Sequence, residues 1–99
     1  MNLLVADIGG TNARFGFQKS INSEITSIKF LECKNFPKIE DAIEFYISAN
    51  DLKVKNLSLS VAGPCGQNIV KLTNNHWRFD KKKILKKFAC NSILAINDF

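Results

Sequence analysis

The sequence has few cysteines, a single histidine and no long apolar run, and each shortage excludes a class of protein. Cys33, Cys65 and Cys90 are odd in number and far apart, which argues against a disulfide framework or a cysteine-based zinc site. We expect them to be reduced and to behave as small hydrophobic residues. His76 has no second histidine or nearby cysteine with which to share a metal ion, so we do not favour a metal or catalytic role for it.

Membrane and export signals are also missing. No segment approaches the ~20 consecutive apolar residues of a transmembrane helix. The N-terminus runs directly into a predicted strand, without the basic segment, apolar segment and cleavage site of a secretory leader. Low-complexity tracts and internal repeats are absent as well. These shortages predict a cytoplasmic protein that has no membrane partner.

The composition is that of an ordinary globular domain, with 45% hydrophobic and 23% charged residues in a chain of 99. A chain of this length removes roughly 60–70% of its unfolded surface from water on folding, enough for one modest core. The formal net charge is +5, and the five lysines of residues 81–87 account for all of it. We interpret these lysines as the solvated face of an amphipathic helix, and a surface that follows nucleic-acid phosphates is the alternative.

The most informative stretch is the turn at Gly9 and Gly10, which joins an apolar strand to a second strand rich in phenylalanine. Glycine adopts positive φ without a Cβ clash, so the backbone can bend sharply and present consecutive N–H groups to an anion. Thr11 and Asn12 add short side-chain donors. The pattern predicts a hairpin that holds a phosphate group, and a plain hairpin whose glycines serve only the turn is the alternative.

Asp7 stands just before the glycines, in an otherwise apolar strand. A buried charge there is costly unless a cation or hydrogen-bond donors meet it. A carboxylate repels a phosphate, but it can hold Mg²⁺, or the water shell of Mg²⁺, that accompanies a nucleotide. Neither the dinucleotide-binding glycine fingerprint nor the lysine-bearing P-loop is present, so the predicted nucleotide site is of another kind.

The remaining elements alternate along the chain. Residues 24–31 predict a third strand, and residues 39–47 place apolar side chains at the i, i+3, i+4, i+7 spacing of a helix. Further strands are expected at 57–62, 68–72 and 92–96, and a second helix begins after the N-cap Asp80. We expect the 57–62 and 68–72 strands to form a small hairpin. The order predicts an α/β layer in which antiparallel strands join a parallel set.

Ligands of such sheets bind outside the carboxyl ends of the strands, where Asp7 and Asp98 are both expected. Two carboxylates at neighbouring strand ends indicate phosphoryl transfer. Asp7 would manage metal and phosphate, Asp98 would accept the proton of an attacking hydroxyl, and Asn97 would orient that substrate. An ordinary turn residue is the alternative for Asp98. A metal-dependent nuclease is a competing hypothesis, but it needs a tight carboxylate cluster, for which Glu44 is a poor third member.

The run from Asp7 to Arg14 resembles the first phosphate loop of the bacterial glucokinases. This family of sugar kinases belongs to the actin-like ATPase superfamily. Three further blocks resemble the family in the same order: Ser60–Pro64, Leu72–Asn74 with Trp77, and Ile96–Phe99. The resemblance implies a ribonuclease-H-like (actin-like ATPase) mixed sheet with flanking helices. It also implies phosphorylation of glucose by ATP and Mg²⁺ to give glucose 6-phosphate.

The resemblance carries residue roles with it. By motif match, the ATP phosphate site comprises Ala6, Asp7, Ile8, Gly9, Gly10, Thr11 and Asn12. Asp7 would meet the metal only indirectly, through Mg-ATP. Asn97 and Asp98 would bind the sugar, and Asp98 would be the catalytic base.

In the family, a larger second domain follows, so the resemblance implies that residues 1–99 are the N-terminal domain of a two-domain kinase. The second phosphate loop, the adenosine-binding segment and the sugar-binding Glu and His residues are missing. A general base raises the reaction rate by ~10²–10⁴-fold, whereas positioning both reactants lowers the barrier by roughly 7–11 kcal/mol. This chain keeps the base but lacks half of the cleft walls that would position the reactants. We therefore expect little or no activity from the isolated chain. Its expected partners are glucose and a separately encoded C-terminal domain, or a second copy through exposed apolar surface; a non-catalytic remnant is the alternative.

Overall fold

The computed structural model describes residues 2–98, so Phe99 of the last family-like block lies outside the described residues. The elements follow the chain as β1 (Leu3–Ile8), β2 (Asn12–Gln18), β3 (Thr26–Glu32), a short 3₁₀ turn η1 (Cys33–Asn35), α1 (Ile39–Ala49), β4 (Asn56–Val61), β5 (Ile69–Lys71), β6 (Arg78–Asp80), α2 (Lys81–Lys87) and β7 (Ser92–Asn97). The helices and the longer strands lie where the sequence pattern predicts them.

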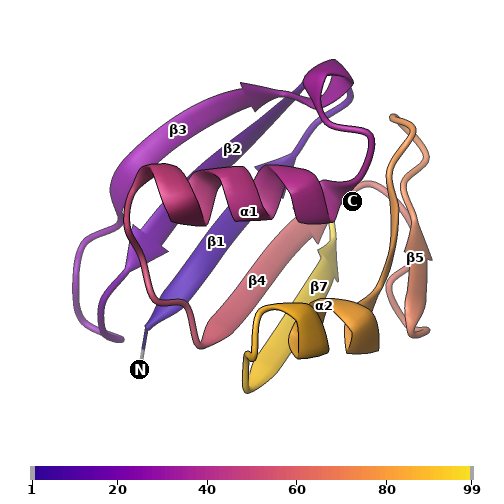
Figure 1. Cartoon of the computed structure of the whole chain (residues 1–99). Coiled ribbons are helices and arrows are strands. Elements are labelled where there is room, and N and C mark those ends of the chain that lie inside the picture. The colour runs from indigo at the N-terminus through magenta and orange to yellow at the C-terminus, as the bar shows by residue number, and fades with distance from the viewer. Residues whose placement is uncertain (1, 99) are drawn as a thin grey trace.

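A five-stranded sheet in the order β3-β2-β1-β4-β7 forms the centre of the fold (Figure 1). The pairs β1–β2 and β2–β3 are antiparallel, because short turns connect them. The pairs β1–β4 and β4–β7 are parallel, and each needs a long crossover that carries a helix. The predicted mixed sheet is therefore confirmed.

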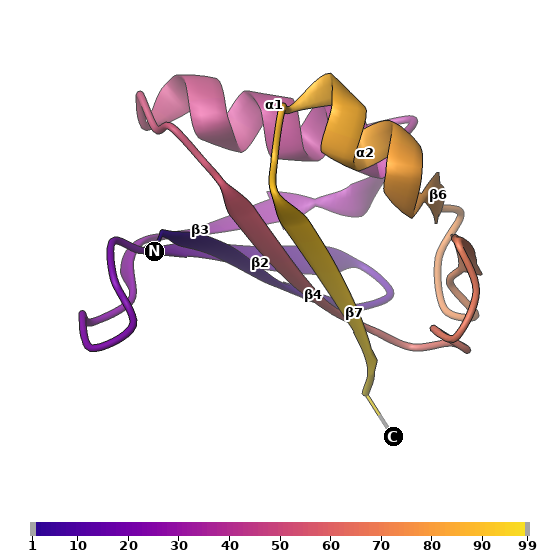
Figure 2. The ribbon, with the colours of Figure 1, turned by 90° about the horizontal axis from the view of Figure 1, so that it is seen from below.

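Both helices of the described chain cover the same face of the sheet (Figure 2). The apolar stripe of α1, which comprises Ile39, Ala42, Ile43 and Tyr46, is buried there. The Tyr46 ring stacks on Phe15 of β2 with 5.2 Å between centroids, and its hydroxyl donates to the Ser27 carbonyl at 2.8 Å. The core therefore lies between the helices and the sheet. Each large side chain that is buried there stabilises the fold by roughly 1.5–3 kcal/mol.

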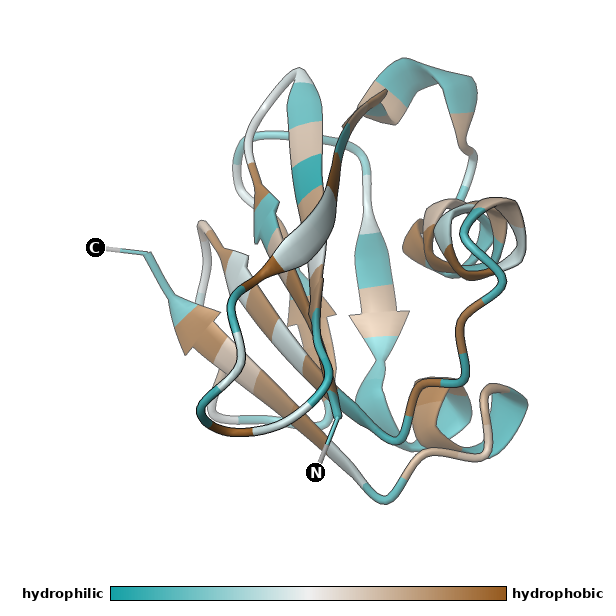
Figure 3. Ribbon diagram, turned by 90° about the vertical axis from the view of Figure 1, so that its left-hand side faces the viewer, coloured by the Kyte–Doolittle hydropathy of each residue, from teal (hydrophilic) through white to brown (hydrophobic). Residues whose placement is uncertain are grey.

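The opposite face of the sheet carries no helix from the described residues, and exposed apolar side chains mark it. Ile28 and Phe30 on β3 and Leu94 and Ile96 on β7 are between 47% and 68% exposed. Apolar and polar bands alternate along the strands, because successive side chains of a strand point to opposite faces (Figure 3). The sheet is thus apolar on both faces near its two edges.

The prediction that residues 57–62 and 68–72 pair with each other is wrong. β4 is hydrogen-bonded to β1 on one edge and to β7 on the other, so it has no free edge for β5. Instead β5 pairs with β6 in a separate two-stranded sheet. β6 is only three residues long, too short to show an alternating pattern in the sequence.

The predicted cap of α2 is confirmed. The Asp80 side chain accepts from the Lys83 N–H at 3.1 Å and from the Asn68 amide at 2.8 Å. The hydrogen bond from Asn68, followed by that from Lys83, lowers the pKa of Asp80 below its usual value. The following lysines, Lys82, Lys83, Lys86 and Lys87, are exposed, as expected of a solvated helix face.

The cysteines are free thiols, as predicted. Burial raises the pKa of Cys33 and of Cys90, which keeps both thiols protonated near neutral pH. Neither helix of residues 2–98 is long and apolar enough to cross a lipid bilayer.

Candidate active site

The glycine turn joins β1 to β2 and is closed by a hydrogen bond from the Gly9 N–H to the Asn12 carbonyl at 2.9 Å. Neither Gly9 nor Gly10 has a positive φ, so the expected reason for these glycines is wrong. Space is the actual reason. A Cβ on Gly9 would lie 3.1 Å from the Asn12 carbonyl oxygen, and one on Gly10 would lie 3.0 Å from that of Asn74.

The turn leaves backbone donors available. Among residues 2–98, neither the Gly10 N–H nor the Thr11 N–H has a hydrogen-bond acceptor. Gly10, Thr11 and Asn12 are exposed, whereas the side chains of Ala6 and Ile8 are buried in the core. The three exposed residues can therefore offer backbone and side-chain donors to an anion. Ala6 and Ile8 position the strand and have no side chain at the surface.

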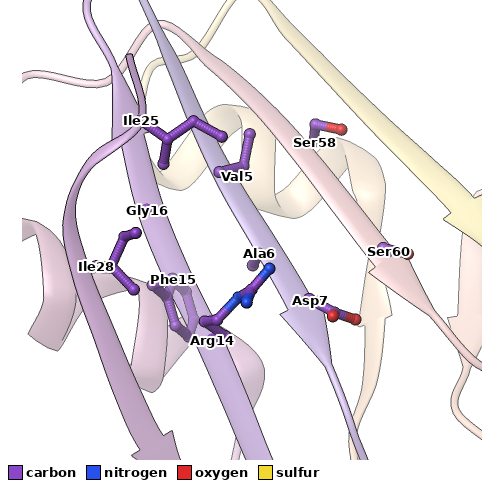
Figure 4. A pocket seen from close by; sticks show the side chains of 10 residues that line it. All are labelled: Val5, Ala6, Asp7, Arg14, Phe15, Gly16, Ile25, Ile28, Ser58 and Ser60. Atoms are coloured by element: carbon purple, nitrogen blue, oxygen red, sulfur yellow. The ribbon is translucent and has the colours of Figure 1, made fainter.

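Asp7 is exposed, so the expectation of a costly buried carboxylate is wrong. The side chains alternate along β1, and that of Asp7 points to the open face of the sheet while its neighbours point into the core. Arg14 lies directly opposite it in the β1–β2 register. Figure 4 shows the Arg14 guanidinium extending towards β1 on this open face, with Asp7 beside Ser60 of the next strand. This set of residues lies at one end of a cavity of about 380 Å³.

A second cavity, of about 360 Å³, joins the glycine turn to the C-terminal aspartate. It is lined by Asp7, Gly9, Asn12, Arg14, Phe30 and Asp98. The structure therefore brings Asp7 and Asp98 to one site, as the sequence predicts. Their strands are not neighbours, however, because β4 lies between β1 and β7.

Asp98 is held at two points by β4. Its N–H donates to the Val61 carbonyl at 2.8 Å, and one carboxylate oxygen, Oδ1, accepts from the Ser60 hydroxyl at 3.2 Å. Asn97 is exposed at the end of β7 and is not among the residues that line the cavity. Of the predicted sugar-site pair, Asp98 thus faces the glycine turn and Asn97 stands beside it.

The site combines unpaired N–H groups, two carboxylates and one guanidinium around an open cavity. Such a set can bind a phosphate chain, balance its charge and accept a proton. Among residues 2–98 there is no group of three or more His, Cys, Asp or Glu side chains that could hold a metal ion. The described residues therefore do not supply the carboxylate cluster that the competing nuclease hypothesis needs.

Residues 4–99 match the family model described as Glucokinase. The chain belongs to the glucokinase family. The glucokinase of Helicobacter acinonychis (strain Sheeba) is 38% identical over 100 residues, covering 97% of this chain and 30% of the relative. The chain thus spans about a third of the length of the curated glucokinases that it matches.

Solved structures agree with this assignment. The crystal structure of a glucokinase from an Antarctic psychrotroph superposes with a TM-score of 0.88 at 33% identity, covering 99% of this chain and 32% of that chain. A ROK family glucokinase from Streptomyces griseus, in complex with glucose and AMPPNP, has a TM-score of 0.73 at 22% identity, covering 99% of this chain and 33% of that one. The second likeness is one of fold. The predicted glucokinase-family, actin-like ATPase fold is confirmed.

Two residues of the site, Arg14 and Ser60, lie in family-like blocks but received no role from the sequence. Arg14 stands two positions after Asn12 on β2, and the hairpin register places it opposite Asp7. Pairing the two strands outward from the turn would have found it. Ser60 lies in a family-like block, but its contact with Asp98 spans 38 residues of sequence and has no local signal.

His76 and Trp77 belong to the wall of the domain. Trp77 is 1% exposed, and its indole N–H donates to the Phe36 carbonyl at 2.8 Å, so it fills the edge of the core. His76 Nε2 lies 3.0 Å from the same carbonyl. The contact with Phe36 gives His76 a structural role.

Proposed function

We propose that this chain forms one wall of the catalytic cleft of a glucokinase, an enzyme that transfers the γ-phosphoryl group of ATP to the 6-hydroxyl of glucose. The observation that carries the proposal is the shared cavity between the glycine turn and Asp98. A phosphate donor held at the turn and a hydroxyl held at Asp98 would meet there. Membership of the glucokinase family supports the same substrates.

The turn fits a nucleotide triphosphate. Gly10 and Thr11 offer N–H groups without acceptors among the described residues, and the Thr11 and Asn12 side chains add donors. Arg14 adds a positive charge at the same cavity. A phosphate chain needs such an array of fixed donors, because the transition state of phosphoryl transfer spreads negative charge over its oxygens.

Asp7 fits an indirect role towards Mg²⁺. It is exposed at the cavity, and within residues 2–98 it belongs to no group of three or more His, Cys, Asp or Glu side chains that could hold a metal ion directly. Mg²⁺ in phosphoryl-transfer sites keeps several waters and takes its remaining ligands from the phosphates. We propose that Asp7 accepts hydrogen bonds from those waters. When bound, Mg-ATP supplies the phosphoryl group and neutralises part of its charge.

Asp98 is the proposed general base. Because its Oδ1 accepts from Ser60, the second oxygen, Oδ2, is left to accept the proton of the glucose 6-hydroxyl. As the hydroxyl oxygen bonds to the γ-phosphorus, the bond from that phosphorus to the β,γ-bridging oxygen breaks and ADP leaves. Asn97 and Asp98 would hold the sugar. The Asp98–Val61 hydrogen bond fixes the backbone from which the base extends.

The rest of the cleft must come from elsewhere, because the chain spans 30% of the length of its relative. We propose that the remaining wall is supplied by the other part of a glucokinase, encoded with this chain or separately. Self-association through the open sheet face stays a prediction, as does a cytoplasmic location. We expect the 99 residues alone to show little glucose-dependent ATP consumption, and robust turnover by the purified chain would contradict this.

Substitution of Asp98 tests the proposed chemistry. In the complete enzyme that contains these residues, Asp98→Asn should lower kcat by about 10²–10⁴-fold, because the general base is lost. Glucose binding should change little, since Asn keeps the shape and the acceptor oxygen. Asp51→Asn is the matched control: Asp51 is exposed after α1 with φ 50°, a conformation that Asn also adopts. Equal turnover by wild type and Asp98→Asn would remove Asp98 as the base.

A further inference from the structure

The loop of residues 73–77 packs against the glycine turn, although the two are far apart in sequence. The Asn75 side-chain amide donates to the Gly9 carbonyl at 3.1 Å, across 66 residues. Its carbonyl oxygen accepts from the Trp77 N–H at 2.6 Å. The same loop brings the Asn74 carbonyl to 3.0 Å from the position of a Cβ on Gly10. Asn75 therefore links the turn to a loop that Trp77 anchors in the core.

This contact fixes the orientation of one peptide unit. The Gly9 carbonyl and the Gly10 N–H belong to the same planar trans peptide, so they point in opposite directions. Asn75 holds the carbonyl on the side of the loop, and the Gly10 N–H must then face away from the loop. Gly10 is exposed, and its N–H has no acceptor among residues 2–98. Gly9 itself lines the cavity that contains Asp98.

A second contact supports the other part of the turn. The Cys33 N–H donates to the Thr11 carbonyl at 2.8 Å. The Cys33 sulfur lies 3.6 Å from the Asn75 amide nitrogen, so the two supporting residues touch behind the turn. Without Asn75, the Gly9–Gly10 peptide keeps only the weak contact from the Cys33 thiol to the Gly9 carbonyl at 3.8 Å, because the Gly9–Asn12 bond is made by the preceding peptide. The Gly9–Gly10 peptide can then rotate, since glycine has little steric barrier to other φ and ψ values.

We propose that Asn75 is a positioning residue for the phosphate site, because its amide holds the Gly9–Gly10 peptide so that the Gly10 N–H faces the bound triphosphate. The inference rests on the proposed role of the turn in phosphate binding. Asn75 touches no reacting atom. A preorganised donor binds an anion more tightly than a rotating one, since the ordering has been completed beforehand. Loss of one such hydrogen bond corresponds to about a 2–10-fold weaker binding.

Two variants separate the proposed role from simple support of the loop. Asn75→Asp keeps the oxygen that accepts from Trp77 and loses the amide that donates to Gly9. Asn75→Ala loses both contacts and adds no charge. An effect that Asn75→Asp and Asn75→Ala share is therefore not caused by repulsion between the new carboxylate and phosphate. Asn22→Asp introduces the same charge on an exposed turn between β2 and β3, and it is the control.

The first measurement needs no ligand. Residual dipolar couplings of the Gly10 N–H bond, recorded on the 99-residue chain, report the orientation of that bond. We expect the wild-type and Asn22→Asp couplings to match the structure. In Asn75→Asp and Asn75→Ala, the Gly10 coupling should shrink towards zero while those of β1 and β2 are kept. A Gly10 coupling that is already averaged in wild type, or unchanged in both variants, would overturn the proposal.

The second measurement is a titration of each protein with Mg-ATP, followed by the amide shifts of Gly10 and Thr11. Weaker binding by about 2–10-fold in both Asn75 variants, but not in Asn22→Asp, is expected. Equal affinity in all proteins would overturn the positioning role. If Mg-ATP moves neither amide in wild type, the proposed phosphate site fails, and the couplings still decide whether Asn75 orients the peptide.

Discussion

Gly63 offers the sharpest test of how the two-stranded sheet of β5 and β6 is attached to the central sheet. It follows β4 with φ +150°, and a Cβ added there would lie 2.5 Å from the Lys71 carbonyl oxygen of β5. A residue forced into such a backbone conformation costs about 1–3 kcal/mol. The clash is with backbone, so it can be relieved only by moving β5 away from the end of β4.

That movement would strain the next contact along the chain. The Thr73 N–H and the Thr73 hydroxyl both donate hydrogen bonds to the Ala62 carbonyl, at 2.9 Å and 3.1 Å. Losing them adds roughly 1 kcal/mol per bond. We therefore expect Gly63→Ala to lower the free energy of unfolding by about 2–5 kcal/mol. With a urea dependence of about 1–3 kcal/mol per molar, the midpoint of urea unfolding should fall by roughly 1 M or more.

Gly66→Ala is the matched control, because a Cβ there meets nothing within 4 Å and the residue has no positive φ. It should be neutral or should stabilise by up to about 1 kcal/mol, since alanine restricts the unfolded chain. The assay is urea unfolding of each purified chain, followed by Trp77 fluorescence. A loss below about 1 kcal/mol for Gly63→Ala, or equal midpoints for the two variants, would refute the reasoning.

Two further predictions concern the domain wall and the helix cap. Trp77→Phe should destabilise the chain by about 1–3 kcal/mol, because it removes the indole donor to Phe36 and leaves unfilled volume. In a domain of this size, each kcal/mol lowers the thermal midpoint by roughly 4–8 °C. A midpoint within about 2 °C of wild type, measured by circular dichroism, would contradict a structural role for the indole. The depressed pKa of Asp80 predicts that its contribution to stability is complete above about pH 4, the usual Asp pKa, and is lost as pH falls further through the folded-state pKa. Asp80→Asn should therefore lose less stability than wild type in thermal unfolding between pH 5 and pH 3, and parallel pH profiles would show that Asp80 does not titrate in this way.

Local patterns predicted the parts of the fold whose contacts are themselves local. The hairpin, the apolar stripe of α1 and the Asp80 cap each depend on residues within a few positions of one another. The spacing of side chains along a strand or helix is fixed by backbone geometry, so the sequence alone reveals which face is apolar. The family blocks added the identity of the glycine turn and of Asp98.

Pairing between distant segments could not be predicted in this way. β5 joined β6 because both edges of β4 were already occupied, and this follows only from the order of strands in the sheet. The same holds for the exposure of Asp7, which depends on which face of the sheet the helices cover. The Ser60 contact to Asp98 and the Asn75 contact to Gly9 join residues 38 and 66 positions apart.

The glycine turn shows both limits. Its sequence determined that two strands would meet there, that small residues were required and that donors would surround an aspartate. The tertiary structure decided why the glycines are needed, because the close approach of the Asn74 carbonyl, and not a positive φ, excludes a side chain at Gly10. It also decided how Asp98 reaches the turn, because β4 lies between β1 and β7 and the two aspartates meet across that strand.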